Sequence, residues 1–129
     1  IGCGGVGMAA INGAAIAGAG RIIAVDTNPA KLQLATKLGA TDLVNPKEGD
    51  PVAKVKEITG GGVQYSFEVL GSKVTAEQAF AMLGPGGTAT VVGMVPFGTK
   101  VELHGADSIH VDFRGLRSKL AAGHRATVG

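Results

Sequence analysis

Tryptophan is absent from the 129-residue sequence, and cysteine occurs once, as Cys3. A single cysteine excludes an internal disulfide and favours a cytoplasmic location. Aromatic residues make up only 4% of the chain, so valine, isoleucine, leucine and alanine must build the core. The sequence also lacks C-x-x-C and H-E-x-x-H spacings, and His104, His110 and His124 fit no common set of metal ligands. We therefore expect surface positions for the histidines and no metal site in this chain.

An excess of charge of one sign is lacking as well. The 12 basic and 10 acidic residues are interspersed and leave a net charge of +2. This balance is unlike that of a nucleic-acid-binding surface. The first 20 residues carry no charge, but seven of them are glycine and no basic segment precedes them, which disfavours a signal peptide or membrane span. We expect a chain that binds neither nucleic acid nor membranes.

Glycine, by contrast, is abundant, at 22 of 129 residues against an average of about 7%. No repeat period explains this number, so the glycines are expected at turns and at close backbone contacts. Gly39 and Gly84 follow the last apolar residues of helical patterns, where C-terminal caps are expected. Asn28 before Pro29 is the corresponding signal for the start of a helix.

Apolar, β-branched segments alternate along the chain with segments of helical periodicity. The expected strands are Arg21–Asp26, Thr41–Val44, Val63–Val69 and Gly87–Val95, with Lys100–Leu103 and Ile109–Phe113 as weaker candidates. The expected helices are Val6–Gly18, Pro29–Leu38, Pro51–Ile58 and Thr75–Leu83. This alternation predicts βαβ units, and therefore an α/β fold with a doubly wound parallel sheet of the Rossmann type.

The segment Gly2-Cys3-Gly4-Gly5-Val6-Gly7 has the spacing G-x-G-x-x-G. In dinucleotide-binding folds the first glycine permits a tight turn from strand to helix. The second lets a pyrophosphate approach the backbone, and the third lets the helix pack on the sheet. The helix that follows would offer free N–H groups and the positive end of its dipole to the phosphates.

Asp26 ends the next expected strand, 19 residues after Gly7. A carboxylate in this place can accept both hydroxyl groups of the adenosine ribose and would repel a 2′-phosphate, so NAD(H) is favoured over NADP(H). A glycine-rich structural turn with a solvated aspartate is the alternative. Cys3 also permits two interpretations: an ordinary loop residue, or a thiol whose pKa is lowered by the helix N-terminus.

Longer stretches of the sequence resemble a known family. The segments GCGGVG, AGAGRIIAVDTNPAKLQLATKLGATDLVNP, GGGVQYSFEVLGS and LGPGGTATVVGM look like the coenzyme-binding domain of zinc-dependent medium-chain alcohol dehydrogenases. The sequence is most similar to bacterial enzymes that oxidise primary or aromatic alcohols or thiol adducts of formaldehyde. The resemblance implies a dinucleotide-binding domain over residues 1–115, part of an oxidoreductase that transfers hydride between an alcohol and NAD. Residues 116–129 depart from the family and form a basic tail.

The family's cofactor contacts can be carried over residue by residue. The resemblance implies a pyrophosphate loop, two residues at the adenosine ribose, a stretch beside the ribose groups and a segment at the nicotinamide. The residues of the pyrophosphate loop are Gly2, Gly4, Gly5, Val6 and Gly7, and those at the adenosine ribose are Asp26 and Lys31. The stretch beside the ribose groups is Val69, Leu70 and Gly71, and the segment at the nicotinamide is Gly93 and Met94. Leu116 would lie near the carboxamide. Glu68 is interpreted as a strand-end residue near the cofactor, and no catalytic residue is expected in this chain.

In the family, a zinc ion held by a separate N-terminal domain polarises the alcohol, and hydride passes to the nicotinamide. This chain lacks such ligands and is expected to be inactive by itself as a dehydrogenase. The first strand, central in the order 3-2-1-4-5-6, would be missing except for Ile1. We therefore expect an N-terminally truncated domain whose open sheet edges favour self-association. The alternative is a free-standing module that binds a nucleotide or self-associates without dehydrogenase activity.

Overall fold

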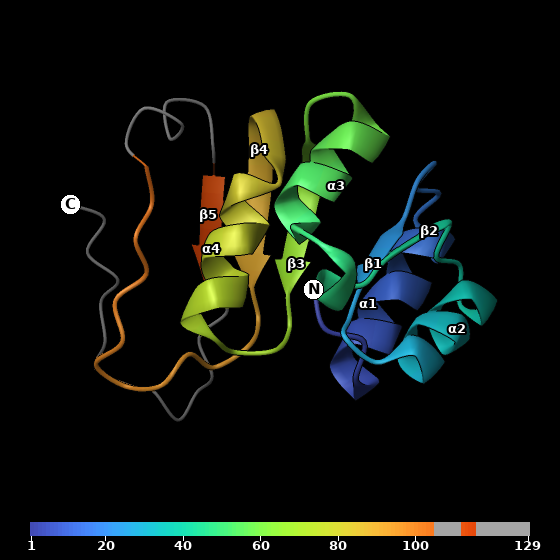
Figure 1. Cartoon of the computed structure of the whole chain (residues 1–129), viewed down its shortest axis with the longest axis horizontal. Coiled ribbons are helices and arrows are strands. Elements are labelled where there is room, and N and C mark those ends of the chain that lie inside the picture. The colour runs from blue at the N-terminus through green and yellow to red at the C-terminus, as the bar shows by residue number, and fades with distance from the viewer. Residues whose placement is uncertain (105–111, 116–129) are drawn as a thin grey trace.

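Helices and strands alternate along the computed structural model, which describes residues 1–104 and the backbone of 112–115 (Figure 1). The helices are α1 (Gly5–Ile16), α2 (Pro29–Lys37), α3 (Pro51–Thr59) and α4 (Lys73–Ala81), with a short 3-10 helix, η1 (Pro46–Glu48). The strands are β1 (Ile23–Val25), β2 (Asp42–Val44), β3 (Val63–Glu68), β4 (Leu83–Val91) and β5 (Asp112–Gly115). The predicted alternation is therefore confirmed, with ends that shift by a few residues.

The strands of the described chain form two parallel sheets. In the first, β1 pairs with β2, and Ile23 lies opposite Asp42. In the second, β4 pairs with β3 on one side and with β5 on the other, so that Ala89 lies opposite both Ser66 and Phe113. Parallel strands joined by helices are the arrangement that the sequence predicts.

The backbone of Ile1 joins the two sheets. Its amino nitrogen donates a hydrogen bond to the carbonyl oxygen of Phe67 (2.6 Å), and its own carbonyl accepts one from Val69 N–H (3.0 Å). On the other side, Gly2 N–H donates to the carbonyl of Val25 (2.8 Å). The order across the molecule is therefore β2, β1, Ile1, β3, β4, β5, and Figure 1 shows the N-terminus between β1 and β3.

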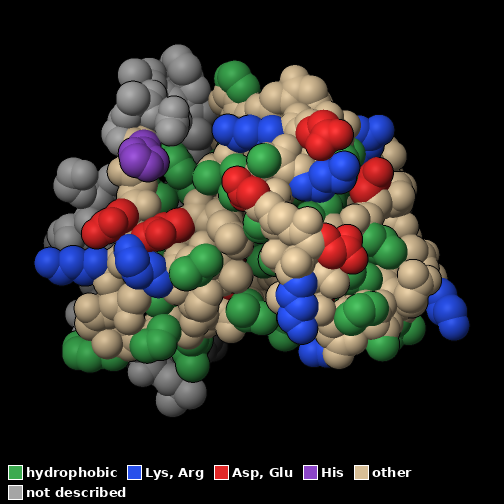
Figure 2. Space-filling view, in the orientation of Figure 1, with side chains coloured by type: hydrophobic (Ala, Val, Ile, Leu, Met, Phe, Trp, Pro, Cys, Tyr) green, Lys and Arg blue, Asp and Glu red, His purple; other side chains and the backbone are tan. Residues whose placement is uncertain are grey.

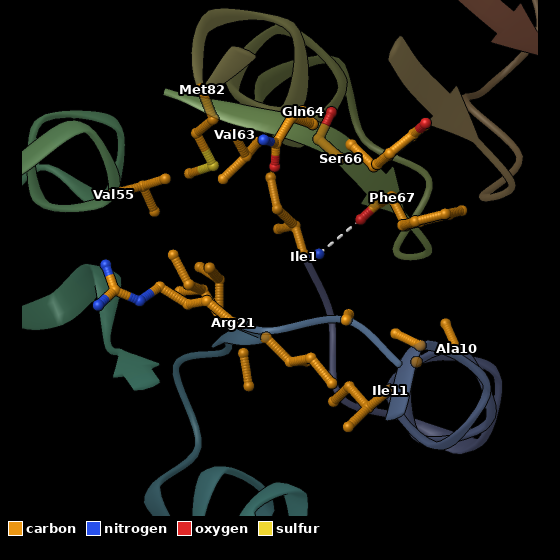
Figure 3. A pocket seen from close by; sticks show the side chains of 18 of the residues that line it. Ile1, Ala10, Ile11, Arg21, Val55, Val63, Gln64, Ser66, Phe67 and Met82 are labelled. Atoms are coloured by element: carbon orange, nitrogen blue, oxygen red, sulfur yellow. Dashed lines mark hydrogen bonds between the residues drawn. The ribbon is translucent and has the colours of Figure 1, made fainter. Parts of the chain in front are cut away.

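A cavity of about 670 Å³ lies in this gap (Figure 3). Ala10 and Ile11 of α1 line one side of it, Val55 of α3 and Met82 line the opposite side, and Ile1 lies between them. Apolar side chains from two layers thus flank a space that is bordered by the edges of two strands.

Aliphatic side chains fill the core, as the shortage of aromatic residues requires. Around α1 and α2, one cluster contains Ile11, Ile22, Ala24, Leu32 and Ala35; a second, beside α3, contains Val25, Val44, Val55 and Met82. Phe80 adds an aromatic ring to a third cluster beside β4. On the face shown in Figure 2, basic and acidic side chains are interspersed, so neither sign of charge dominates there.

The helix starts follow the capping residues. Asn28, Asp50 and Ser72 each accept a backbone N–H of the first turn of α2, α3 and α4, respectively. Gly39, after α2, has a φ of +120°, as expected for a glycine at a helix end. These caps depend on local backbone geometry, which explains why the sequence alone could predict the start of α2.

The prediction that Gly84 caps a helix is wrong. Helix α4 ends at Ala81, with Met82 as its C-cap in a right-handed conformation, and Gly84 belongs to β4. Gly62 has a φ of +131°, and a Cβ there would lie 2.3 Å from the backbone nitrogen of Gly84. The absence of a side chain at Gly62 therefore permits its backbone to pack against the start of β4 at Gly84.

The prediction of a strand at Lys100–Leu103 is also wrong, because these residues have no regular structure. The backbone N–H of Glu102 donates to the carboxylate of Glu77 on α4 (2.9 Å) instead of to a neighbouring strand. Of the expected strand Ile109–Phe113, residues 109–111 lie outside the described part, and β5 covers its end. No helix within the described residues is both long and apolar enough to cross a membrane.

Candidate dinucleotide site

The glycine-rich loop folds tightly against the start of α1. Gly2 has a φ of +95°, a conformation that favours glycine. A Cβ at Gly7 would lie 1.9 Å from the carbonyl oxygen of Gly2, so no side chain fits there. At Gly4 and at Gly5, by contrast, a Cβ would meet no atom within 4 Å, and both residues are exposed. The loop thus combines a close backbone contact with an open space.

The N-terminus of α1 faces this space without a side-chain partner. Gly4 is the N-cap, and the helix has neither a side-chain cap nor an acidic residue in its first turn. Val6, in that turn, is 58% exposed. The first N–H groups of a helix have no partner within the helix, and the helix dipole makes this end positive. The arrangement suits a phosphate group.

Asp26 lies beside the loop at the end of β1, and backbone hydrogen bonds fix its carboxylate. Cys3 N–H donates to Oδ2 (2.8 Å) and Asn28 N–H donates to Oδ1 (2.8 Å). Each carboxylate oxygen can accept two hydrogen bonds, so each still has one free acceptor position for a hydroxyl group. Lys31 lies exposed in the first turn of α2.

Cys3 is buried, with its Sγ 3.8 Å from the carbonyl oxygen of Val25. Burial raises the pKa of this thiol, and the negative charge of Asp26 raises it further. The interpretation of Cys3 as an activated thiol is therefore wrong. Its backbone N–H, and not its sulfur, contributes to the site.

Two further loops meet on the other side of α1, at the carboxyl ends of β3 and β4. Gly71 has a φ of +89°, and a Cβ there would lie 2.6 Å from the carbonyl oxygen of Met94. A Cβ at Gly93 would lie 2.2 Å from the backbone nitrogen of Gly71. Val69 joins this pair to the glycine-rich loop, because its Cγ2 lies 3.2 Å from the Cβ position of Gly2. Leu70 and Met94 are 62% and 80% exposed.

The structure therefore gathers the sequence-predicted residues at one edge of the parallel strands. Asp26 and Lys31 lie on the β1 side, the glycine-rich loop lies in the middle, and the loops after β3 and β4 lie on the far side. Open parallel sheets bind ligands at this edge, where neighbouring helices lie on opposite faces. Leu116 falls outside the described residues.

The comparison with known families matches residues 5–119 to the profile described as "Zinc-binding dehydrogenase". The chain belongs to this family. The resemblance to zinc-dependent medium-chain alcohol dehydrogenases is thus confirmed, and the match extends over α1 and every later helix and strand of the described chain.

Relatives of known structure share the fold. An alcohol dehydrogenase zinc-binding domain protein from Burkholderia ambifaria is 45% identical, with a TM-score of 0.88, over 90% of this chain and 32% of its own. Benzyl alcohol dehydrogenase from Acinetobacter calcoaceticus is 40% identical, with a TM-score of 0.86, over 89% of this chain and 32% of its own. A protein from Sinorhizobium meliloti 1021, classed as a zinc-binding dehydrogenase, is 30% identical, with a TM-score of 0.81, over 87% of this chain and 34% of its own. The structure of that protein contains bound NADP.

Among curated proteins, the S-(hydroxymethyl)glutathione dehydrogenase of Synechocystis sp. (strain ATCC 27184 / PCC 6803 / Kazusa) is 45% identical over 103 residues. The match covers 78% of this chain and 28% of that enzyme. The chain thus spans about a third or less of the length of these relatives.

The family's zinc has no site among the described residues. They contain no group of three or more histidine, cysteine, aspartate or glutamate side chains that could hold a metal ion. A catalytic zinc site needs about three protein ligands. Of the histidines, His104 is exposed, and His110 and His124 lie outside the described part. The donor set of these residues therefore does not fit zinc.

Proposed function

We propose that this chain binds NAD(H) as the coenzyme domain of an alcohol dehydrogenase. One observation carries the proposal. The uncapped N-terminus of α1 faces an open space at Gly4 and Gly5, between the Asp26 carboxylate and the loops after β3 and β4. A dinucleotide needs this order of features, because its pyrophosphate separates two nucleoside halves.

In this proposal the pyrophosphate lies on the backbone of the glycine-rich loop, and Gly4 is open because the ligand fills the space above it. Asp26 accepts the adenosine ribose hydroxyls, and Lys31 reaches the same ribose. The stretch Val69, Leu70 and Gly71 lies beside the ribose groups and leads to the nicotinamide, which lies over Gly93 and Met94. Bound NAD would supply the hydride acceptor, while the residues of this chain bind and orient it.

We further propose that NAD(H) is preferred to NADP(H). Two unit charges 4 Å apart interact by about 4 kcal/mol at the effective dielectric constant of a protein surface. A 2′-phosphate beside the fixed carboxylate of Asp26 would experience repulsion of this order. The NADP-bound relative is a different protein at 30% identity, so the test must be made on this chain.

The experiment is a fluorescence titration of the chain with NADH and with NADPH at low and high salt. We expect at least tenfold tighter binding of NADH, and a smaller ratio for Asp26→Asn, which keeps the shape of the side chain but removes its charge. Equal affinity for the two cofactors would contradict the assignment of Asp26. Failure to bind either one in a folded sample would contradict the function.

Hydride transfer from an alcohol also requires a group that stabilises the alcohol oxygen. The described residues do not supply zinc ligands, so we assign this step to residues outside the described part or outside this chain. A cytoplasmic location, where NAD-linked oxidation takes place, remains our expectation.

Self-association is a second candidate function, and the gap between β1 and β3 favours it. Among the residues that the structure describes, Ile1 and Gly2 bridge this gap with backbone hydrogen bonds to Phe67, Val69 and Val25, and the remaining edges of β1 and β3 border the cavity. Such edges pair with strands of other chains when nothing covers them. Sedimentation velocity over a range of protein concentrations would test this candidate; a monomer at every concentration would exclude it.

A further inference from the structure

Glu68 lies where the two loops on the far side of the candidate site meet. It is the last residue of β3, and its side chain is completely buried. Its carboxylate oxygen Oε1 accepts hydrogen bonds from the N–H groups of Leu70 (2.8 Å) and Gly71 (2.7 Å), and from the Thr75 hydroxyl (2.8 Å). One oxygen atom therefore fixes the loop after β3 and attaches it to the first turn of α4.

The same residue also holds the loop after β4. The backbone carbonyl of Glu68 accepts hydrogen bonds from Val92 N–H (2.8 Å) and Gly93 N–H (3.1 Å). A Cβ at Gly93 would lie 2.6 Å from Glu68 Oε2, so the carboxylate lies directly against the backbone of this second loop. Glu68 thus contacts both segments that border the far half of the site.

The second carboxylate oxygen, Oε2, is buried and has no hydrogen-bond partner among the described residues. A buried polar atom without a partner destabilises a fold, and most native proteins avoid it. An apolar residue at the end of β3 would avoid this cost, but it would leave the N–H groups of Leu70 and Gly71 and the Thr75 hydroxyl without their acceptor. The carboxylate thus combines one oxygen that holds the loop after β3 with one that bears a desolvation cost, and what Glu68 contributes to the site is the geometry of the two loops that it contacts.

We propose that Glu68 is a positioning residue for the nicotinamide half of the cofactor. The inference rests on the proposed NAD(H) site, in which α1 holds the pyrophosphate and Asp26 holds the adenosine half. The far half must then lie over the loops after β3 and β4, which Glu68 holds in place. Small displacements of positioning groups strongly reduce productive binding, and these loops have no other buried acidic side chain within the described chain to fix them.

The proposal separates the two halves of the ligand, which can be measured. ADP contains the adenosine and the two phosphates but no nicotinamide. Loss of the loop geometry should weaken NADH much more than ADP, because the main contacts proposed for ADP are with the loop 2–7, Asp26 and Lys31. A purely structural role would weaken both ligands together, or neither.

The experiment compares dissociation constants for NADH and ADP in wild type, Glu68→Ala and Glu68→Gln. We expect Glu68→Ala to weaken NADH at least tenfold and to keep ADP within twofold. Glu68→Gln retains one oxygen that can accept the three donated hydrogen bonds, so NADH affinity should stay within threefold of wild type. Circular dichroism establishes that each variant is folded.

Ser66→Ala is the matched control. Ser66 is buried on the same strand and the same face, but its hydroxyl donates to the carbonyl of Ala79 within α4 (2.7 Å) and contacts neither loop. We expect it to lower stability without changing the ratio of NADH to ADP affinity. Thr75→Val, which removes one donor to Oε1, should shift the ratio in the direction of Glu68→Ala, and it replaces that variant if Glu68→Ala does not fold.

The outcomes are distinguishable. If wild type binds ADP and NADH but the ratio is the same in Glu68→Ala, or in Thr75→Val as its replacement, the positioning role is refuted and the proposed function stands. If Ser66→Ala changes the ratio as much as Glu68→Ala, the effect is a general loss of stability and the positioning role is again refuted. If folded wild type binds neither ligand, the proposed function fails and the inference fails with it.

Discussion

Two glycines of the same loop are expected to fail for opposite reasons when they are substituted. Gly4→Val should abolish nucleotide binding in a folded chain. Gly4 is exposed, has an extended backbone with φ −77° and ψ −165°, and has open space at its Cβ position. Valine is a poor N-cap compared with glycine, which costs about 0.5–1 kcal/mol. In the complex, however, its methyl groups would occupy the space of the pyrophosphate.

Gly7→Ala should instead destabilise the fold. The added Cβ would lie 1.9 Å from the carbonyl oxygen of Gly2 and 2.8 Å from its carbonyl carbon. Both atoms belong to the main chain, so no side-chain rotation can relieve the contact. Inserting an atom into a packed site costs about 1–3 kcal/mol, and we expect the upper end of this range. Gly13→Ala is the control, because a Cβ at this exposed position of α1 meets nothing within 4 Å. It should stabilise the chain by about 0.5–1 kcal/mol through helix propensity.

The assays are urea denaturation followed by far-ultraviolet circular dichroism, and NADH titration of each folded variant. We expect Gly4→Val to raise the dissociation constant at least a hundredfold, which corresponds to about 2.8 kcal/mol. The urea midpoint should rise in the order Gly7→Ala, wild type, Gly13→Ala. Wild-type affinity in folded Gly4→Val, or equal midpoints for the two alanine variants, would refute this account of the loop.

Three further predictions follow from the gap, the ligand inventory and the buried thiol. The first concerns an extended, valine-rich segment of about five residues fused in front of Ile1, which would pair with β1 and β3. Relative to a glycine-serine segment of equal length, it should raise the urea midpoint and reduce self-association. Equal midpoints for the two fusions would contradict this prediction. The second is that the purified chain retains no stoichiometric zinc and does not reduce NAD in the presence of primary or aromatic alcohols. Metal analysis and the absorbance of NADH test this prediction, and one zinc per chain would contradict it. Because burial raises the pKa of Cys3, its alkylation at mildly alkaline pH should be much slower in the folded chain than in urea, and equal rates would show that the thiol is accessible.

The part of the fold that the sequence predicts rests on short-range signals. The alternation of strands and helices follows from hydrophobic periodicity, and the start of α2 follows from Asn28 and Pro29, which act through their immediate neighbours. The glycine-rich loop is predictable for the same reason: Gly2 and Gly7 are only a few residues apart, and their contact is a local one.

The errors concern contacts between distant segments. Gly84 has the position expected of a helix cap, but it packs against Gly62, a residue that no local pattern connects to it. Lys100–Leu103 alternates like a strand, but a strand also needs a neighbouring edge, and Glu102 bonds to a side chain of α4 instead. Propensity and periodicity contain neither piece of information.

Glu68 shows why the most informative residue of the site was also the least predictable. The segment Val63–Val69 alternates in character and places Glu68 on the same face as Ser66, which by itself indicates a polar, solvent-facing side of the strand. In the structure this face is the buried one, since Ser66 bonds to the backbone of α4 and Glu68 collects its donors from Leu70, Gly71 and Thr75. Only the fold of the loop after β3 brings these donors together. A buried carboxylate therefore contradicts the local pattern, and such contradictions are concentrated at functional sites, because a sequence selected for stability alone would not retain them.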